Sequence, residues 1–311
     1  MSLSVSFGFP DPGTFGPVHA TIGTFDGLHR GHLRVVTPVI EGARAAGVAS
    51  LVVTFEPHPR CVLDPDHCPQ NLTTLDEKTW LLEQLGLDHL LVIPFTPQVS
   101  ALSPAEFMGR LTRGMQLRQL FVGYDFAFGR GRRGDHTFLR QLATRQGFAL
   151  DGVPAQERGG APISSSRIRR LLLLGQVRAA SQLLGRDYFL RSVVEQGAQR
   201  GKGLGFPTAN LKITPNKLLP ANGVYAVRVD LEGSGYQGAL NLGFRPTFGG
   251  HALTVEVFLF DYQGDLYGKL LTVFFVQRLR GERRFASVTA LQQQISRDVE
   301  TARRVLSRSS S

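Results

Sequence analysis

The sequence predicts an α/β protein in two domains: a doubly wound parallel sheet, followed by a small antiparallel β-barrel with a terminal helix. Three observations lead to this prediction. Apolar strand-like runs alternate with amphipathic helical segments from residue 18 to about residue 155, and after residue 185 the pattern changes to short β segments with glycine turns. The length of 311 residues also exceeds what one hydrophobic core usually serves. We expect domains at residues 1–184 and 185–311.

The first half predicts a parallel sheet because its strands and helices alternate along the chain. Capping boxes at residues 74–77 and 103–106 begin two of the helices, and Pro38 predicts a kink in the first helix or a late start. Apolar strands joined by right-handed helical crossovers require a sheet that is covered on both faces. The expected elements are strands at 18–22, 50–55, 90–93 and 120–123, and helices from 32, at 74–86, from 103 and at 137–145.

The second half begins with helical segments at 168–174 and 177–184, and then reads as a small barrel. A last helix carries an apolar stripe from Val288 to Leu306, which we expect to pack against the barrel. The expected strands lie at 189–195, 224–231, 237–242, 254–260 and 270–276.

The stretch at residues 23–32, Gly-Thr-Phe-Asp-Gly-Leu-His-Arg-Gly-His, follows the first strand and opens the first helix. Gly23 and Gly27 allow the backbone to turn sharply and to approach a ligand, and His29 and His32 lie at a helix start whose N–H groups favour phosphate. In a doubly wound sheet this turn falls at the switch point, where ligands bind. We interpret the stretch as a nucleotide-phosphate site. The alternative is a capped, solvated helix start.

Three further loops are expected at the same sheet edge. Residues 55–60 follow the second strand, and residues 124–135 combine three aromatic residues with a basic, glycine-rich tail that suits a planar ring beside a phosphate. Residues 163–169 offer serine hydroxyls at a helix start, with Arg169 one turn in. The alternatives are a solvated loop or a single-stranded nucleic-acid contact for 124–135, and a plain serine cap for 163–169.

The barrel half has its own glycine loop at residues 197–210. Its glycines expose backbone N–H groups to an anion, and Thr208 and Asn210 offer neutral oxygens at alternate positions, which with nucleotide phosphates and water suit Mg²⁺. A hairpin turn is the alternative. Glu256 stands between Val255 and Val257, so it either has a partner or a chemical role, or simply faces solvent while the valines face inward.

Composition limits the class of protein. The formal net charge is +10, and 30 of the 35 basic residues are arginines, so nucleic acid or phosphorylated small molecules are suitable partners, although surface solvation explains the charge equally well. The sequence shows neither an apolar run of membrane-spanning length nor an N-terminal signal pattern, and we expect a cytoplasmic protein. Cys61 and Cys68 fit neither a zinc site nor a disulfide framework, and we expect free thiols.

Taken together, these motifs resemble the bacterial bifunctional riboflavin kinase and FAD synthetase family. The resemblance implies that the first domain transfers AMP from ATP to FMN, giving FAD and pyrophosphate, and that the barrel phosphorylates riboflavin to FMN. The motifs that carry it are the nucleotidyltransferase-like signature at 23–32, a second nucleotide motif at 163–169, the kinase-like signature Leu-Gly-Phe-Pro-Thr-Ala-Asn at 204–210, Asn-Leu-Gly-Phe-Arg-Pro-Thr at 241–247 and Asp-Leu-Tyr-Gly at 265–268.

The resemblance also implies roles for single residues. Glu256 matches the family's catalytic glutamate, Thr208 and Asn210 match its Mg²⁺ ligands, and His29 and His32 are the catalytic groups at the ATP phosphates. Nucleotide contacts are implied at Gly23, Phe25, Asp26, Gly27, Gly31, Ser165, Ser166, Arg169, Gly197, Gly201, Gly203 and Gly205, and flavin contacts at Pro57, Asp125, Phe128, Asn241 and Arg280.

Two other functions fit part of the pattern. A basic RNA-associated protein, synthetase-like or single-strand-binding, would share the paired histidines and the barrel, but the sequence contains no Lys-Met-Ser-Lys-Ser-like loop. A second possibility is a single-activity enzyme whose barrel binds flavin only as a regulatory ligand. We expect riboflavin, FMN and ATP as small-molecule partners, no nucleic-acid or membrane partner, and a monomer or weak oligomer.

Overall fold

A computed structural model of the protein describes residues 2–195, 206–247 and 250–308. The described chain divides into two compact units, Met1–Ser165 and Ser166–Ser311. Two helices that we assigned to the first domain, α7 (Ser165–Leu173) and α8 (Val177–Leu184), are grouped almost entirely with the second unit. The boundary at residues 184 and 185 stays a prediction.

The first unit contains the predicted parallel sheet. All five strand pairings are parallel, in the order β1-β4-β3-β2-β5-β6. The strands are β1 (Ser4–Phe7), β2 (Phe15–Ile22), β3 (Ala49–Glu56), β4 (His89–Pro94), β5 (Met115–Gly123) and β6 (Ala149–Val153). We did not predict β1 and β6, the two edge strands, because they are short and largely solvent-accessible and so lack a fully apolar run.

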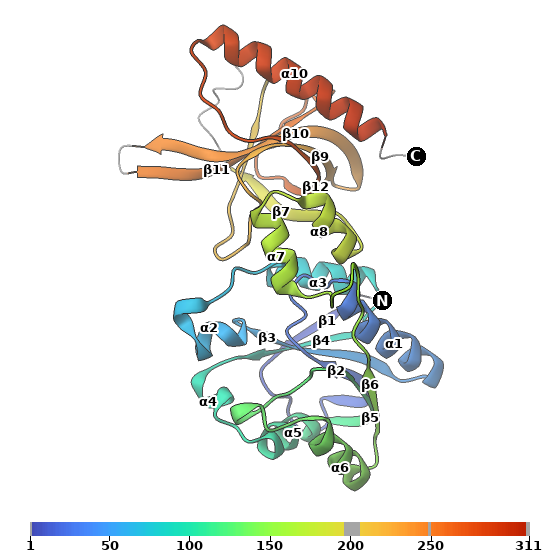
Figure 1. Cartoon of the computed structure of the whole chain (residues 1–311). Coiled ribbons are helices and arrows are strands. Elements are labelled where there is room, and N and C mark those ends of the chain that lie inside the picture. The colour runs from blue at the N-terminus through green and yellow to red at the C-terminus, as the bar shows by residue number, and fades with distance from the viewer. Residues whose placement is uncertain (1, 196–205, 248–249, 309–311) are drawn as a thin grey trace. The chain divides into compact units, whose positions relative to one another are not determined.

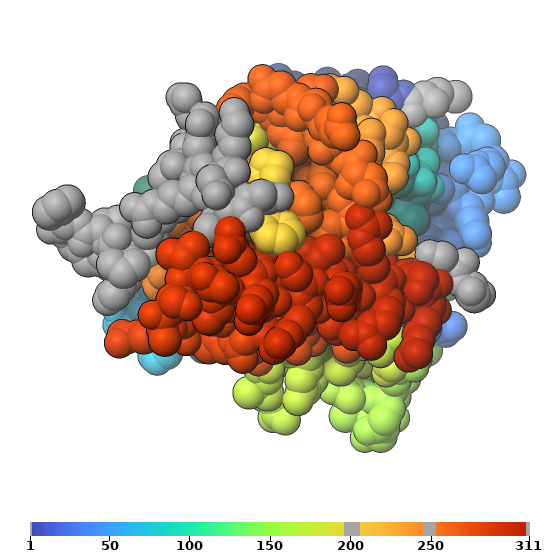
Figure 2. Space-filling view, turned by 90° about the horizontal axis from the view of Figure 1, so that it is seen from above, coloured from blue at the N-terminus to red at the C-terminus, as the bar shows by residue number. Residues whose placement is uncertain are grey.

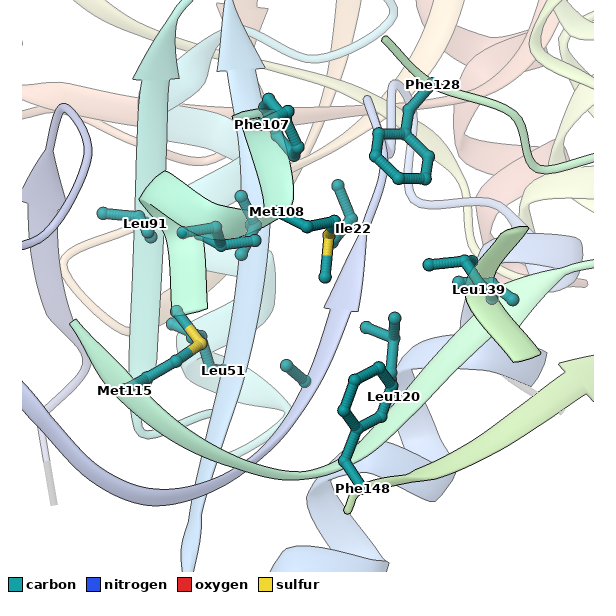
Figure 3. Close-up of a cluster of buried hydrophobic side chains, with 14 of the residues drawn as sticks. Ile22, Leu51, Leu91, Phe107, Met108, Met115, Leu120, Phe128, Leu139 and Phe148 are labelled. Atoms are coloured by element: carbon teal, nitrogen blue, oxygen red, sulfur yellow. The ribbon is translucent and has the colours of Figure 1, made fainter. Parts of the chain in front are cut away.

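Helices cover both faces of this sheet, as right-handed crossovers require (Figure 1). The helix α5 brings Phe107 and Met108 onto one face (Figure 3), together with Leu111, and α1 packs Val35 and Val39 against Phe121 on the other. The helices are α1 (Arg30–Ala46), α3 (Leu75–Gln84), α5 (Pro104–Arg113) and α6 (His136–Gln146), with the short turns α2 (Pro59–Leu63), η1 (Pro65–His67), α4 (Pro97–Ser100) and η2 (Arg130–Arg132).

The strand order confirms the predicted position of the 23–32 stretch. From β2 the chain builds outward through β3 and β4, and then returns to the other side of β2 with β5 and β6. The reversal occurs between β2 and β5, so the turn after Ile22 lies at the switch point of the sheet. The helix α1 begins two residues before the predicted start and continues through Pro38.

The second unit contains a closed antiparallel barrel with the strand order β10-β11-β8-β7-β12-β9, as predicted. Tyr225, Phe189 and Phe275 are almost fully buried. The last helix, α10 (Val288–Ser307), packs Ala302 and Leu306 against the barrel and forms a continuous red band in Figure 2. The strands are β7 (Tyr188–Glu195), β8 (Ala209–Leu211), β9 (Gly223–Leu231), β10 (Ser234–Thr247), β11 (Gly250–Leu259) and β12 (Leu270–Arg280).

The expectation of free thiols is wrong. Cys61, in α2, and Cys68, after η1, form a disulfide across a separation of seven residues. The sequence spacing did not show this because two consecutive short helical turns bring the Cα atoms to 4.2 Å. Among the described residues, no helix is both long enough and apolar enough to cross a membrane.

The disulfide gives a direct test by thiol labelling. Under non-reducing, denaturing conditions we expect no alkylation of Cys61 or Cys68, because both sulfurs are in the bond, and two alkylated cysteines after reduction with dithiothreitol. Intact-mass spectrometry measures both states. Two alkylations before reduction would show that the pair is open.

Candidate functional site

The Gly23–His32 turn is held in a conformation that few sequences allow. Phe25 and Leu28 have φ angles of 46° and 39°, and Gly27 has a φ of 80°. A Cβ atom on Gly23 would lie 2.9 Å from the Phe25 ring, and one on Gly27 would lie 2.7 Å from Leu72. The two glycines are therefore needed for close packing, and the left-handed residues Phe25, Gly27 and Leu28 turn the chain toward the helix.

The two histidines of the turn lie against each other at the start of α1. His29 is the N-cap residue, and its Nδ1 accepts a hydrogen bond of 3.2 Å from the backbone N–H of His32. The imidazole rings stack with their centroids 3.6 Å apart. Because Nδ1 accepts, neutral His29 carries its proton on Nε2, which can donate to an anion. His29 is buried and His32 half-buried, and a Cβ atom on Gly31 would crowd the His29 ring at 3.1 Å.

Asp26 anchors the turn to a distant segment. Its carboxylate accepts hydrogen bonds from the backbone N–H groups of Leu72 and Thr73, each at 3.1 Å, and the backbone N–H of Gly27 donates to the Thr73 hydroxyl at 3.0 Å. The Ser165 hydroxyl donates to the Asp26 carbonyl at 2.9 Å. The structure thus brings Ser165 to the turn. Ser166 and Arg169 continue along α7 in the second unit.

Sequence reasoning missed a group of buried polar residues beneath the turn. The Lys78 side chain is buried, and its Nζ donates to the Thr24 carbonyl at 2.7 Å and to the Thr54 hydroxyl at 3.1 Å. Burial lowers the pKa of Lys78, while Asp26 and Glu56 oppose this shift. The sequence spacing could have indicated this burial, because Lys78 lies on the same face of α3 as the buried Leu81 and Leu82, which follow it by three and four residues.

Glu56, at the end of β3, belongs to the same group. Burial raises the pKa of the Glu56 carboxyl, Lys78 lowers it, and the neighbouring Asp26 raises it. A carboxyl with a raised pKa holds its proton to a higher pH than a solvated glutamate does.

In the barrel, three predicted site residues share one row across adjacent strands. Glu256 on β11 is the register partner of Asn210 on β8 and of Asn241 on β10. Val255 and Val257 are buried, so Glu256 projects from the other face of the barrel wall, as simple alternation predicts. Glu256 is half-buried there, and Asn241 is exposed.

The motif at 206–210 lies beside this row. The Phe206 ring packs edge-on against Phe258, with centroids 5.6 Å apart, and Phe258 is two residues from Glu256 on the same face. Thr208 is half-buried and precedes Asn210 by two residues. Gly197, Gly201, Gly203 and Gly205 lie outside the described residues.

Arg280 and Glu282 organise the end of β12. The Arg280 guanidinium binds both carboxylate oxygens of Asp298 on α10, at 2.7 to 3.1 Å. Glu282, which sequence reasoning missed, accepts hydrogen bonds from the Phe244 backbone N–H at 3.2 Å and from the Asn222 amide at 3.1 Å. The Glu282 carboxylate lies against Gly243, where a side chain would collide with it. Gly243 is two residues after Asn241, so Glu282 lies close to the predicted flavin contact.

Comparison with known proteins identifies the family. Residues 14–167 match the FAD synthetase family and residues 184–306 match the riboflavin kinase family. The bifunctional riboflavin kinase/FMN adenylyltransferase of Pseudomonas fluorescens is 40% identical over 286 residues, which is 91% of each chain. The chain belongs to the bifunctional riboflavin kinase/FMN adenylyltransferase family. The Bacillus subtilis member is 35% identical and covers 92% of each chain.

The fold agrees with this family assignment. A crystal structure of a Streptococcus pneumoniae protein, described as a macrolide-efflux protein, has a TM-score of 0.86 and 30% identity, and the match covers 97% of this chain and 99% of that one. As a member of the bifunctional riboflavin kinase/FMN adenylyltransferase family, the chain has an N-terminal FAD synthetase domain and a C-terminal riboflavin kinase domain. The comparisons give no support to an RNA-associated function.

The flavin contacts predicted in the FAD synthetase domain lie in different environments. Pro57 and Asp125 are exposed, on the loops after β3 and β5. Phe128 is buried in the core beside Phe107 (Figure 3), and Phe126, half-buried, stacks on it at 5.4 Å. The burial of Phe128 makes Phe126 the more accessible of the two rings. All three flavin contacts stay predictions.

The residues predicted as metal ligands in the riboflavin kinase domain carry neutral oxygens. Across the described residues, no group of three or more His, Cys, Asp or Glu side chains is placed to hold a metal ion. Thr208 and Asn210 supply a hydroxyl and an amide oxygen two residues apart on an extended segment. Such a partial set fits Mg²⁺ when nucleotide phosphates and water complete the shell.

The raised pKa of Glu56 predicts a pH-dependent stability. A group whose pKa is raised on folding stabilises the native state below its unfolded value of about 4.5 and loses that contribution as the pH rises through the folded value. We therefore expect Glu56→Gln to gain free energy of unfolding, relative to wild type, as the pH increases from 4 to 8. Urea unfolding followed by the fluorescence of Trp80, the single tryptophan, measures this in the first unit.

The exposed Glu83 on the same helix provides the control for this measurement. Glu83→Gln makes the same chemical change at a position outside the group formed by Asp26, Glu56 and Lys78. A Glu56→Gln curve that runs parallel to wild type would contradict the expected linkage.

Proposed function

We propose that FMN adenylylation takes place at the Gly23–His32 turn and that riboflavin phosphorylation takes place at the row formed by Asn210, Glu256 and Asn241. The observation that carries this assignment is a difference in chemistry between the two units. The first unit offers stacked imidazoles at a helix start, which suit an anion, and the second offers a half-buried carboxylate between two amides.

Adenylyl transfer needs no general base. The FMN phosphate is already an anionic nucleophile at neutral pH; its oxygen forms the new bond to the α-phosphorus of ATP, and the bond to pyrophosphate breaks. The enzyme's task is then to stabilise charge on the triphosphate. We assign this to His29 and His32, to the helix N-terminus and to Ser165, Ser166 and Arg169, with backbone contacts at Gly23, Phe25, Asp26, Gly27 and Gly31.

Riboflavin phosphorylation makes a different demand. The ribityl hydroxyl must lose a proton as its oxygen attacks the γ-phosphorus, and ADP leaves. Glu256 is assigned as the general base that accepts this proton. Thr208 and Asn210 would hold Mg²⁺, which when bound neutralises charge on the phosphates. The glycines at 197, 201, 203 and 205 are assigned to the nucleotide.

The remaining assignments complete the proposal. Flavin contacts are assigned to Pro57, Asp125 and Phe128 in the first domain and to Asn241 and Arg280 in the second. The ion pair with Asp298 holds the Arg280 guanidinium in one position, which suits a flavin contact at that site.

The last assignments concern the whole protein. Because both reactions consume ATP, we place the protein in the cytoplasm. We assign it as a monomer or weak oligomer that acts on small molecules rather than nucleic acid, with its domain boundary at residues 184 and 185.

A pair of reciprocal variants tests the assignment of the two reactions. With riboflavin, ATP and Mg²⁺ we expect the wild-type chain to form FMN first and FAD afterwards. Glu256→Gln should lower FMN formation by about 10²- to 10⁴-fold, because the general base is lost, and leave FAD formation from supplied FMN intact. His32→Asn should lower FAD formation by about 10²-fold, through loss of a charge-stabilising group, and leave FMN formation intact. Chromatographic separation of the flavins over time measures both rates.

Equal loss of the two activities in either variant would contradict the separation into two sites. Retention of FMN formation by Glu256→Gln would contradict the role of Glu256 as base. Full retention of FAD formation by His32→Asn would contradict the phosphate role of His32.

The assignment of Thr208 and Asn210 predicts a shifted magnesium dependence. Excess EDTA should abolish riboflavin phosphorylation, because the ATP phosphates lose their counterion. In Thr208→Val and Asn210→Leu, half-maximal FMN formation should require roughly 10-fold more Mg²⁺, about 1.4 kcal/mol in affinity. Thr254→Val, which changes a hydroxyl on β11 that bonds to the Gly243 carbonyl, is the control. Unchanged magnesium titrations in both ligand variants would contradict the assignment.

A further inference from the structure

The peptide that joins Thr24 to Phe25 is fixed by a closed triangle of hydrogen bonds. Its carbonyl oxygen accepts from Lys78 Nζ at 2.7 Å and from the Thr54 hydroxyl at 3.1 Å. Lys78 Nζ also donates to that hydroxyl at 3.1 Å, which closes the triangle. The three residues come from the turn after β2, the end of β3 and the first half of α3, so the triangle joins three separate chain segments.

The triangle determines the direction of the next backbone N–H. A peptide unit is planar and trans, so the N–H of Phe25 points opposite to the Thr24 carbonyl. Since that carbonyl points at the buried Lys78, the Phe25 N–H points away from the buried group. Backbone N–H groups turned outward beside left-handed residues form the concave sites that bind anions.

The same triangle precedes the strained part of the turn. Left-handed φ angles at Phe25 and Leu28 are costly for residues with side chains, and they persist only where the surroundings impose them. The Leu28 N–H donates to the Phe25 carbonyl at 3.1 Å, and the Asp26 carboxylate is held by Leu72 and Thr73. Lys78 therefore fixes the entrance of the turn, and the Asp26 bonds fix its middle.

Burying the Lys78 ammonium group at this position costs free energy. Its ammonium group loses its hydration on burial, whereas the apolar face of α3 would accept a methionine at no such cost. The charged groups that interact with Lys78 are Asp26, from the turn, and Glu56, from the end of β3. The cation therefore offsets two carboxyl groups directly beneath a site assigned to a polyanion.

We propose that Lys78 is a positioning residue of the adenylyltransferase site. It orients the Thr24–Phe25 peptide toward the ATP phosphates and reduces the negative potential of Asp26 and Glu56 beneath them. This inference rests on the proposed assignment of the Gly23–His32 turn to ATP.

Kinetics of Lys78→Met test the inference, because methionine retains the packing volume and removes the donor and the charge. We expect the KM for ATP in FAD formation to rise about 10-fold and kcat/KM to fall about 10²-fold, since displaced phosphate contacts are costly. Riboflavin phosphorylation in the same full-length chain should stay within twofold of wild type. Lys269→Met, at a partly exposed lysine on the barrel, is the matched control and should change neither activity.

Two further variants separate positioning from a purely structural role. Thr54→Val removes the hydroxyl, and with it two of the three hydrogen bonds of the triangle, with little change in volume, and it should raise the KM for ATP a fewfold. Lys78→Arg keeps a cationic donor and should recover part of the lost affinity. A structural role alone would lower the active fraction, which the fluorescence of the neighbouring Trp80 reports, and leave the KM of the remaining activity unchanged.

An unchanged KM for ATP in both Lys78→Met and Thr54→Val would overturn the inference. Equal KM values in Lys78→Arg and Lys78→Met would also overturn it, because the cationic donor would then contribute nothing. If the wild-type chain forms no FAD from FMN and ATP, the proposed function fails instead.

Discussion

The hydrogen bonds between the Asp26 carboxylate and the backbone of Leu72 and Thr73 are the interaction on which the first unit depends. They join the turn between β2 and α1 to the segment before α3, which is 46 and 47 residues away in the chain. With Asp26 held, the Gly27 N–H donates to the Thr73 hydroxyl and the Asp26 carbonyl accepts a hydrogen bond from Ser165. His29 is then placed to cap α1. A buried carboxylate with these partners defines a single backbone path, because any other path would leave its charge unsatisfied.

The second unit reaches the same rigidity by register rather than by a buried charge. In a closed barrel a strand cannot slip by one residue without turning its apolar side chains outward. The pairing that buries Val255 and Val257 therefore also places Glu256 beside Asn210 and Asn241 on the other face. The positions of the candidate site residues thus follow from the packing of the barrel core.

Sequence patterns were sufficient wherever one local rule determined the structure. Hydrophobic periodicity predicted β2 to β5 and most barrel strands, and the capping boxes of α3 and α5 are formed as predicted. Prediction from the sequence failed where contacts between distant segments determine the structure. The edge strands β1 and β6 gain their pairing from distant partners, Cys61 and Cys68 meet through two short helical turns, and the roles of Lys78 and Glu282 depend on segments 54 and 38 residues away.

The two proposed sites differ because the nucleophiles of the two reactions differ. A phosphate nucleophile carries its charge into the reaction, so a site for it must offset negative charge, and we assign part of this task to the buried ammonium of Lys78 below the turn. A hydroxyl nucleophile is neutral, so its site needs an acceptor for the proton, and a half-buried carboxylate is suited to that task. In our proposal the Lys78 cation lies below the backbone of the turn, where it lowers the negative potential of the site without occupying space needed by the substrate. In the barrel the proposed general base must reach the reacting hydroxyl itself, which agrees with a Glu256 side chain that projects from a strand rather than lying beneath one.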